Sequence, residues 1–323
     1  MKSVTVSAPG KLMLFGEHAV VYGYPCIVTA VNQRLRLTAT IHDKPLLIIN
    51  APDMKIVDYK RPITMLGETE TPKEVQFVAV AVKNFNEKYG LKTGISITTA
   101  SEFKSTTGFG SSSASTVCVI KALSELFGKE LTNKEFFDLS YKTVLDIQKK
   151  GSGFDVASAI FGKTLYFVTG GKTILPLAID NLPIVVGYSG VKADTVRLIN
   201  KVSLLFNENP KLVKDIYKDI GKIVEKAKTA LEKKNFQVLG ELMNLNQIHL
   251  AKLDVSTREL DAMIQASRDA KAYGAKLSGA GGGDCIFALA PEDRMKIIEK
   301  AIKRAGGEIM HITPNAQGVR VEK

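Results

Sequence analysis

The 323-residue chain contains no tryptophan and only three cysteines, and aromatic residues make up 7% of it. Cys26, Cys118 and Cys285 are odd in number and lack C-x-x-C spacing, so the sequence predicts neither a disulfide framework nor a zinc site. We expect each to pack as a small apolar side chain in a reducing compartment. Residues 1–30 hold no apolar signal-peptide core, and no apolar run approaches the roughly 18 residues of a membrane span. A cytoplasmic protein without a membrane partner is expected.

The charge is basic but dispersed. Lysine and arginine total 44 against 33 aspartate and glutamate, a formal net charge of +11, yet the lysines form no run of about five. Few aromatic side chains are present to stack on bases, so a solvated basic surface is favoured over nucleic-acid binding, which we keep as an alternative. A basic field still attracts small anions such as nucleotides or carboxylates. Hydrophobic residues at 45% are typical of a globular protein, and this length predicts two domains.

A glycine- and serine-rich stretch from Lys104 to Phe127 offers an anion site. Its two glycines leave a turn without side-chain bulk, and three serines then begin an apolar helical run. The first turn of a helix presents unpaired N–H groups and a positive dipole end, which suit a phosphate. The stretch is not a P-loop, and the G-K-T at residues 162–164 has Ala157 where the first glycine of that motif belongs. A serine-capped helix after an ordinary turn is the alternative.

A polar cluster lies near the start of the chain. Residues 2–8 and 12–15 are expected to form short strands, with Pro9 and Gly10 turning between them. Lys11, Glu17 and His18 then fall within eight positions of mostly apolar sequence. A single residue of this kind could be a satisfied core group, but three together indicate a site.

Two further glycine clusters follow. Gly151–Ser152–Gly153 ends a helix expected from a capping box at Thr132 to about Lys149, and Asp155 comes next as either a turn cap or a base beside a substrate. In the second cluster, residues 279–283 include four glycines, which packing does not explain because each carries a conformational cost. We expect a loop that another backbone or a ligand approaches closely.

Periodicity predicts the main elements. Strands are expected at residues 27–41, 94–99, 164–168, 184–187 and 285–290, and helices at 74–89 and 210–231. Strand-rich sequence gives way to mainly helical sequence at about residues 180–192, which is where we place the domain boundary.

Together the three glycine motifs resemble those of the GHMP kinases, the superfamily of galactokinase, homoserine kinase, mevalonate kinase and phosphomevalonate kinase. They read P-G-K-L-M-L-F-G-E-H-A-V-V-Y-G, G-F-G-S-S-S-A and K-L-S-G-A-G-G-G-D, and the resemblance covers essentially the whole chain. It implies a two-domain α/β (α+β) fold. Residues 1–185 would form an ATP-binding domain like ribosomal protein S5 domain 2, and residues 186–323 a ferredoxin-like α/β domain.

The resemblance also implies roles for individual residues. Asp155 would accept the proton of the attacking hydroxyl, and Lys11 would keep that carboxylate ionised and stabilise charge on the transferring phosphoryl group. Such a division suits phosphoryl transfer, which needs positioning and charge neutralisation. ATP would be held by Lys104, Gly108, Phe109, Gly110, Ser111, Ser112 and Ser113. Mevalonate would be bound by Glu17, His18, Gly279, Ala280, Gly281 and Gly282.

Two departures from the family pattern matter. Members commonly place a magnesium-binding glutamate about eleven residues before the catalytic aspartate; Asp146, nine before, would fill this role together with Ser112 if the loop is shortened. The segment Q-K-K-G-S-G-F-D also resembles phosphomevalonate kinase, whereas G-E-H-A-V-V-Y-G resembles mevalonate kinase and occupies the expected substrate side. We therefore favour an ATP- and Mg²⁺-dependent mevalonate kinase of isoprenoid biosynthesis, possible as a homodimer. A phosphomevalonate kinase and a non-catalytic nucleotide-binding protein are the alternatives.

Overall fold

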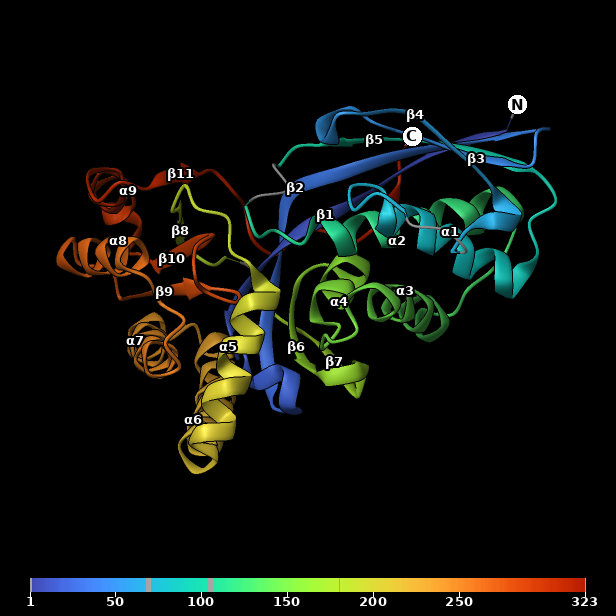
Figure 1. Ribbon diagram of the computed structural model, residues 1–323. Coiled ribbons are helices and arrows are strands. Elements are labelled where there is room, and N and C mark those ends of the chain that lie inside the picture. Colours follow the sequence, from blue (N-terminus) through green and yellow to red (C-terminus); the bar gives the residue numbers. More distant parts are fainter. Residues whose placement is uncertain (1, 68–70, 104–106, 180, 323) are drawn as a thin grey trace.

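The computed structural model describes residues 2–67, 71–103, 107–179 and 181–322, which form two sheets flanked by helices (Figure 1). The larger sheet has the order β12-β1-β2-β5-β3-β4, with β6 paired to β2 and β7 paired to β6. Its strands are β1 (Ser3–Phe15), β2 (Pro25–His42), β3 (Leu46–Ala51), β4 (Ile56–Pro62), β5 (Gly94–Ser101), β6 (Thr164–Val168), β7 (Thr173–Leu177) and β12 (Arg320–Val321). All pairs are antiparallel except β3 with β5. The larger sheet is therefore a mixed one, built around the long strands β1 and β2.

Helices cover this sheet because their apolar residues recur at helical spacing. They are α1 (Gln76–Tyr89), α2 (Ser111–Phe127), α3 (Asn133–Gln148) and α4 (Phe154–Phe161), with a 3₁₀ turn η1 (Ala19–Tyr22) after β1. In α1, Val78, Val82 and Phe85 are buried at steps of three and four. The capping box expected at Thr132 is confirmed: its Oγ1 accepts the Glu135 N–H at 3.2 Å.

The smaller sheet has the antiparallel order β11-β8-β10-β9. Its strands are β8 (Ile184–Tyr188), β9 (Gly274–Ser278), β10 (Cys285–Leu289) and β11 (Glu308–Met310). The helices beside it are α7 (Phe236–Lys252), α8 (Arg258–Asp269) and α9 (Met295–Arg304), while α6 (Pro210–Glu232) packs between α7 and β2 of the larger sheet and α5 (Thr195–Glu208) packs on α6. Short 3₁₀ turns elsewhere are η2 (Pro52–Met54), η3 (Ile63–Met65), η4 (Thr169–Gly171) and η5 (Glu292–Arg294). No helix in the described ranges has the length and apolar character to cross a bilayer.

The turn expected at Pro9 and Gly10 is wrong. β1 runs without interruption, and its register against β2 shifts between these two residues, so they form an irregularity inside one strand. A bulge tolerates proline, which has no N–H to donate. A Cβ on Gly10 would lie 3.2 Å from the Phe109 carbonyl oxygen, so the missing side chain lets another loop pack against the strand here.

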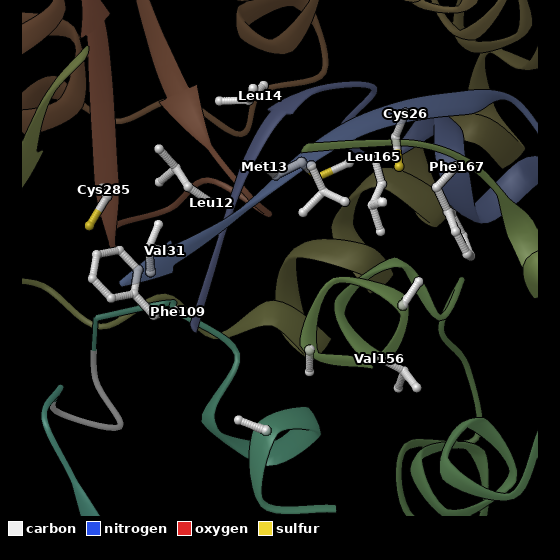
Figure 2. Packing of buried hydrophobic residues seen from close by; sticks show 14 of the residues in the cluster. Leu12, Met13, Leu14, Cys26, Val31, Phe109, Val156, Leu165, Phe167 and Cys285 are labelled. Carbon is white, nitrogen blue, oxygen red and sulfur yellow. The ribbon is translucent and has the colours of Figure 1, made fainter. Parts of the chain in front are cut away.

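Apolar side chains from both sheets meet along β1. Figure 2 shows Cys285 of β10 beside Val31 and Phe109, while Met13 lies near Leu165 of β6. All five are almost completely buried. The three cysteines are free and buried, which confirms their expected packing role. The expected strands at β2, β5, β6, β8 and β10 and the helices α1, α3 and α6 are present, with ends displaced by a few residues. The strands β3, β4, β7, β9, β11 and β12 were not anticipated.

The C-terminal segment returns to the larger sheet. β12 pairs with β1, and Val31 forms a bridge with Pro314. The buried Arg34 guanidinium donates to the carbonyls of Gln317 and Gly318, each at 2.8 Å, and its Nε donates to Ser7 Oγ at 2.6 Å. Residues 186–323 therefore do not all belong with the smaller sheet.

Candidate active site

A pocket of ≈ 440 Å³ opens where the two sheets meet. From the side of the larger sheet it is lined by β1 and by the starts of α2 and α4, and from the other side by the segment that leads into α5 and by the loop between β9 and β10. Each glycine motif thus contributes to one cavity, although the motifs are far apart in the chain.

The first turn of α2 is shaped for an anion. Gly108 and Gly110 have φ of 72° and 78°, a left-handed conformation that favours glycine. The N-cap residue of α2 is Gly110, which has no side chain to cap the helix, so the serine-capped alternative is wrong. Ser111 and Ser112 instead lie in the first turn and line the pocket. Lys104 lies outside the described residues.

Asp155 lies in the first turn of α4, after Gly153 with φ of 91°. Its Oδ2 accepts the Ser113 hydroxyl at 2.6 Å and its Oδ1 accepts the Val156 N–H at 3.0 Å. The helix dipole stabilises a negative charge at this position. Ser113 therefore orients the carboxylate rather than lining the pocket, and Asp155 itself faces the cavity.

Lys11 joins the two helix starts. Its Nζ donates to the Gly108 carbonyl at 2.7 Å and lies 5.5 Å from the centre of the Phe154 ring. Its backbone N–H donates to the Phe109 carbonyl at 2.9 Å. The ammonium group is therefore held between the glycine turn and the residue preceding Asp155. This position suits the role expected for it.

Glu17 does not line the pocket. Its side chain has no solvent exposure and forms an ion pair with Lys276 of β9, whose side chain is equally buried. Burial raises the pKa of Glu17 and lowers that of Lys276, while their mutual attraction opposes both shifts. Within the described residues, Glu17 Oε2 has no hydrogen-bond partner. Sequence reasoning missed Lys276, although a lysine inside the apolar run before the glycine cluster was a visible signal.

His18 lines the pocket beside the Glu17 pair. The carbonyl of Ala280 can only accept, so His18 Nε2 carries the hydrogen and donates at 2.9 Å. Burial lowers the pKa of His18, which favours the neutral ring. The contact also fixes the loop between β9 and β10 against η1.

That loop is glycine-rich partly because backbone packs against it. A Cβ on Gly281 would lie 2.1 Å from the Val255 carbonyl oxygen, and one on Gly283 would lie 2.5 Å from that of Val191. The expected close approach of another backbone is confirmed, whereas the argument that packing cannot explain the glycines is wrong. Gly279 and Ala280 line the pocket, but Gly281 and Gly282 do not.

Asp146 lies away from the pocket, on α3. Its Oδ2 accepts Lys142 Nζ at 2.6 Å and Asn84 Nδ2 at 2.9 Å. The residue eleven before Asp155 is Val144, which is buried and lines the pocket. The helix continues to Gln148, so these residues keep helical spacing and Asp146 points to α1 instead. The described residues contain no group of three or more His, Cys, Asp or Glu side chains that could hold a metal.

Comparisons with known proteins agree with this arrangement. Residues 76–163 match the GHMP kinases N terminal domain and residues 227–308 match GHMP kinases C terminal. The chain is 38% identical to a mevalonate kinase of Pyrococcus abyssi, over 99% of this chain and 98% of that one. It is also 38% identical to a mevalonate kinase of Pyrococcus horikoshii, over 100% of this chain and 99% of that one.

Two solved structures share the fold along nearly their whole length. The Methanococcus jannaschii mevalonate kinase superposes with a TM-score of 0.83 at 28% identity, covering 97% of this chain and 98% of that one. The L. major mevalonate kinase in complex with R-mevalonate superposes with a TM-score of 0.78 at 26% identity, covering 98% and 97%. The chain belongs to the GHMP kinase family.

Proposed function

We propose that the protein is an ATP-dependent mevalonate kinase, which transfers the γ-phosphoryl group of ATP to the 5-hydroxyl of (R)-mevalonate. The observation that carries this proposal is that Lys11, Asp155 and His18 line one pocket, with Lys11 bonded to the glycine turn that begins α2 and Asp155 bonded to Ser113 of the same helix. The full-length likeness to archaeal mevalonate kinases supports the choice of substrate.

The residues present fit a magnesium nucleotide. Gly110 leaves the N–H groups of the first turn of α2 open to the triphosphate, and Lys11 adds a positive charge there. The Ser112 hydroxyl and a carboxylate of the pocket would hold Mg²⁺ together with phosphate oxygens, because this ion is commonly bound by one or two carboxylates plus phosphates. When bound, the ion neutralises charge on the phosphates.

The chain's own side chains would align the acceptor. Ser113 donates to Asp155 Oδ2 and the Val156 N–H donates to Oδ1, and each oxygen keeps a further lone pair, one of which would orient the attacking hydroxyl and take its proton. Lys11 stabilises negative charge on the group being transferred. His18, neutral and held by Ala280, would present its remaining ring face and nitrogen to mevalonate. We further propose that Gly279 and Ala280 close this side of the substrate site.

One observation favours 5-phosphomevalonate as the second candidate acceptor. Lys149, Lys150 and Lys192 line the same pocket, and they could pair with the phosphate of an acceptor that is already phosphorylated. All three are exposed, so their charges are screened by solvent and attract an anion less strongly than a buried lysine would.

An ADP-release assay with magnesium ATP separates the candidates. Mevalonate and 5-phosphomevalonate are offered in parallel, with galactose and homoserine as controls. We expect turnover on mevalonate alone. Turnover on 5-phosphomevalonate alone would overturn the substrate and assign the lysines to its phosphate, whereas nucleotide binding without turnover on any acceptor would favour the non-catalytic alternative.

A further inference from the structure

Asp155 and Asp284 are the two carboxylates that line the pocket within the described residues. We propose that Asp284 Oδ2 is the carboxylate ligand of the divalent cation that accompanies the nucleotide, in the role that Asp146 cannot reach. The inference rests on the proposed function only in assuming that a metal nucleotide binds. It assigns to Asp284 a function that sequence reasoning did not find.

The backbone holds Asp284 in one orientation. It is a non-glycine residue with φ of 56°, its N–H donates to the Val191 carbonyl at 2.7 Å, and its own carbonyl accepts the Ser189 N–H at 2.9 Å. The side-chain Oδ1 accepts the Ala193 N–H at 2.9 Å. With one carboxylate oxygen fixed by this segment, the direction of the other is also set.

Oδ2 is directed at the phosphate-binding turn. An ideal Cβ on Gly108 would lie only 2.5 Å from it, so the absence of a side chain at Gly108 makes room for this oxygen. Lys11, which donates to the carbonyl of the same glycine, attracts the Asp284 carboxylate electrostatically. Asp284 therefore lies at the glycine turn, on the side that faces the segment leading into α5.

Charge explains why a cation belongs there. A carboxylate beside the site of a triphosphate repels that ligand unless a positive charge lies between them. Lys11 and Lys192 attract the Asp284 carboxylate, but a triphosphate and this carboxylate together carry more negative charge than the two lysines neutralise. Magnesium prefers carboxylate and phosphate oxygens, so Asp284 Oδ2 would hold the ion, whose charge would turn the repulsion into attraction.

The other candidates are committed elsewhere. Asp155 accepts the Ser113 hydroxyl at Oδ2 and the Val156 N–H at Oδ1, and Asp146 Oδ2 accepts from both Lys142 and Asn84. Asp284 Oδ2 is thus the pocket carboxylate oxygen best placed for a metal.

Binding of Mn²⁺ with ADP, followed by electron paramagnetic resonance, tests the assignment without any acceptor or turnover. For Asp284→Asn we expect the affinity for the Mn²⁺–ADP complex to fall by at least about tenfold. Affinity for ADP in excess EDTA should stay unchanged or improve, because the repulsive charge is gone. Asp146→Asn is the matched control and should bind both forms as the unaltered protein does. Failure to phosphorylate mevalonate would leave these results untouched.

Equal loss of metal-bound and metal-free ADP in Asp284→Asn would overturn the proposal and leave Asp284 a role in loop packing. Unchanged affinity for Mn²⁺–ADP would overturn it as well. A second variant, Asp284→Cys, guards against a folding defect. A thiolate ligand prefers soft ions, so its ADP affinity should rise with Cd²⁺ relative to Mg²⁺, compared with the unaltered protein. No such change in metal preference would contradict direct ligation.

Discussion

Asp155 lines the cleft and Glu17 lies behind it, next to His18, and the two carboxylates differ in what surrounds them. Glu17 is fully buried and paired with Lys276 of the smaller sheet, whereas Asp155 faces the pocket and accepts a hydrogen bond from the Ser113 hydroxyl. A buried ion pair costs much to break, because removing one partner leaves an unpaired charge without water. Glu17 therefore joins the two halves of the protein, and Asp155 remains available to a ligand.

The first way to break this comparison is Asp155→Asn. The amide keeps the shape of the side chain but removes its charge and its basicity, so kcat should fall by roughly 10³-fold. The free energy of unfolding should change by about 1 kcal/mol or less, since the carboxylate contributes to stability chiefly through the α4 dipole. Steady-state kinetics and urea unfolding measure the two quantities. A kcat within tenfold of the unaltered enzyme would remove Asp155 from the chemistry.

Glu17→Gln should show the opposite balance. It leaves the Lys276 ammonium buried and unpaired, so we expect a loss of about 3–5 kcal/mol in the free energy of unfolding. The double variant Glu17→Gln with Lys276→Met removes the unpaired charge and should be more stable than Glu17→Gln alone. Urea unfolding of the unaltered protein, Glu17→Gln, Lys276→Met and the double variant gives the coupling free energy of the pair. If the double variant is the least stable protein, Glu17 and Lys276 do not depend on each other for stability.

His18 adds a pH dependence to the free energy of unfolding, and we expect this to be the smallest of the three effects. Burial lowers its pKa, so the folded protein keeps the ring neutral while the unfolded chain protonates near its ordinary value of about 6.5. Stability contributed by the neutral ring is present above that pH and is lost as the pH falls below it. His18→Gln, which can still donate to Ala280, should lose less stability between about pH 7.5 and 5. Identical losses in both proteins would show that His18 does not cause this dependence.

Local patterns predicted the half of the site that is built from local structure. Glycine followed by a helical run placed Ser112 and Asp155 at helix starts, and the polar cluster of Lys11, Glu17 and His18 in mostly apolar sequence indicated a site, where Lys11 and His18 do line the pocket. These signals need only a few neighbouring residues, because turns and helix termini are determined over short distances.

Residues whose roles depend on distant partners escaped prediction. Lys276 and Glu17 are 259 positions apart in the chain, so nothing near either residue revealed that they pair. Pro9 and Gly10 suggested a turn because local sequence does not show that β1 pairs with the long strand β2. That pairing continues past both residues with only a shift in register. Asp146 was assigned by its distance in sequence from Asp155, but helical rotation turns its side chain toward α1.

The pairing of β12 with β1 makes the smaller sheet and its helices an insertion within the larger unit, since the chain leaves that unit after β7 and returns to it at its end. Two connections then link the halves, in addition to the buried pair between them. Because α6 also packs against β2 of the larger sheet, the halves are joined by packing as well as by two chain crossings, and free rotation around one linker is excluded. Cutting the chain after residue 312 would release one crossing, and we expect the nucleotide and acceptor sides of the pocket to lose their fixed alignment while each keeps its own residues.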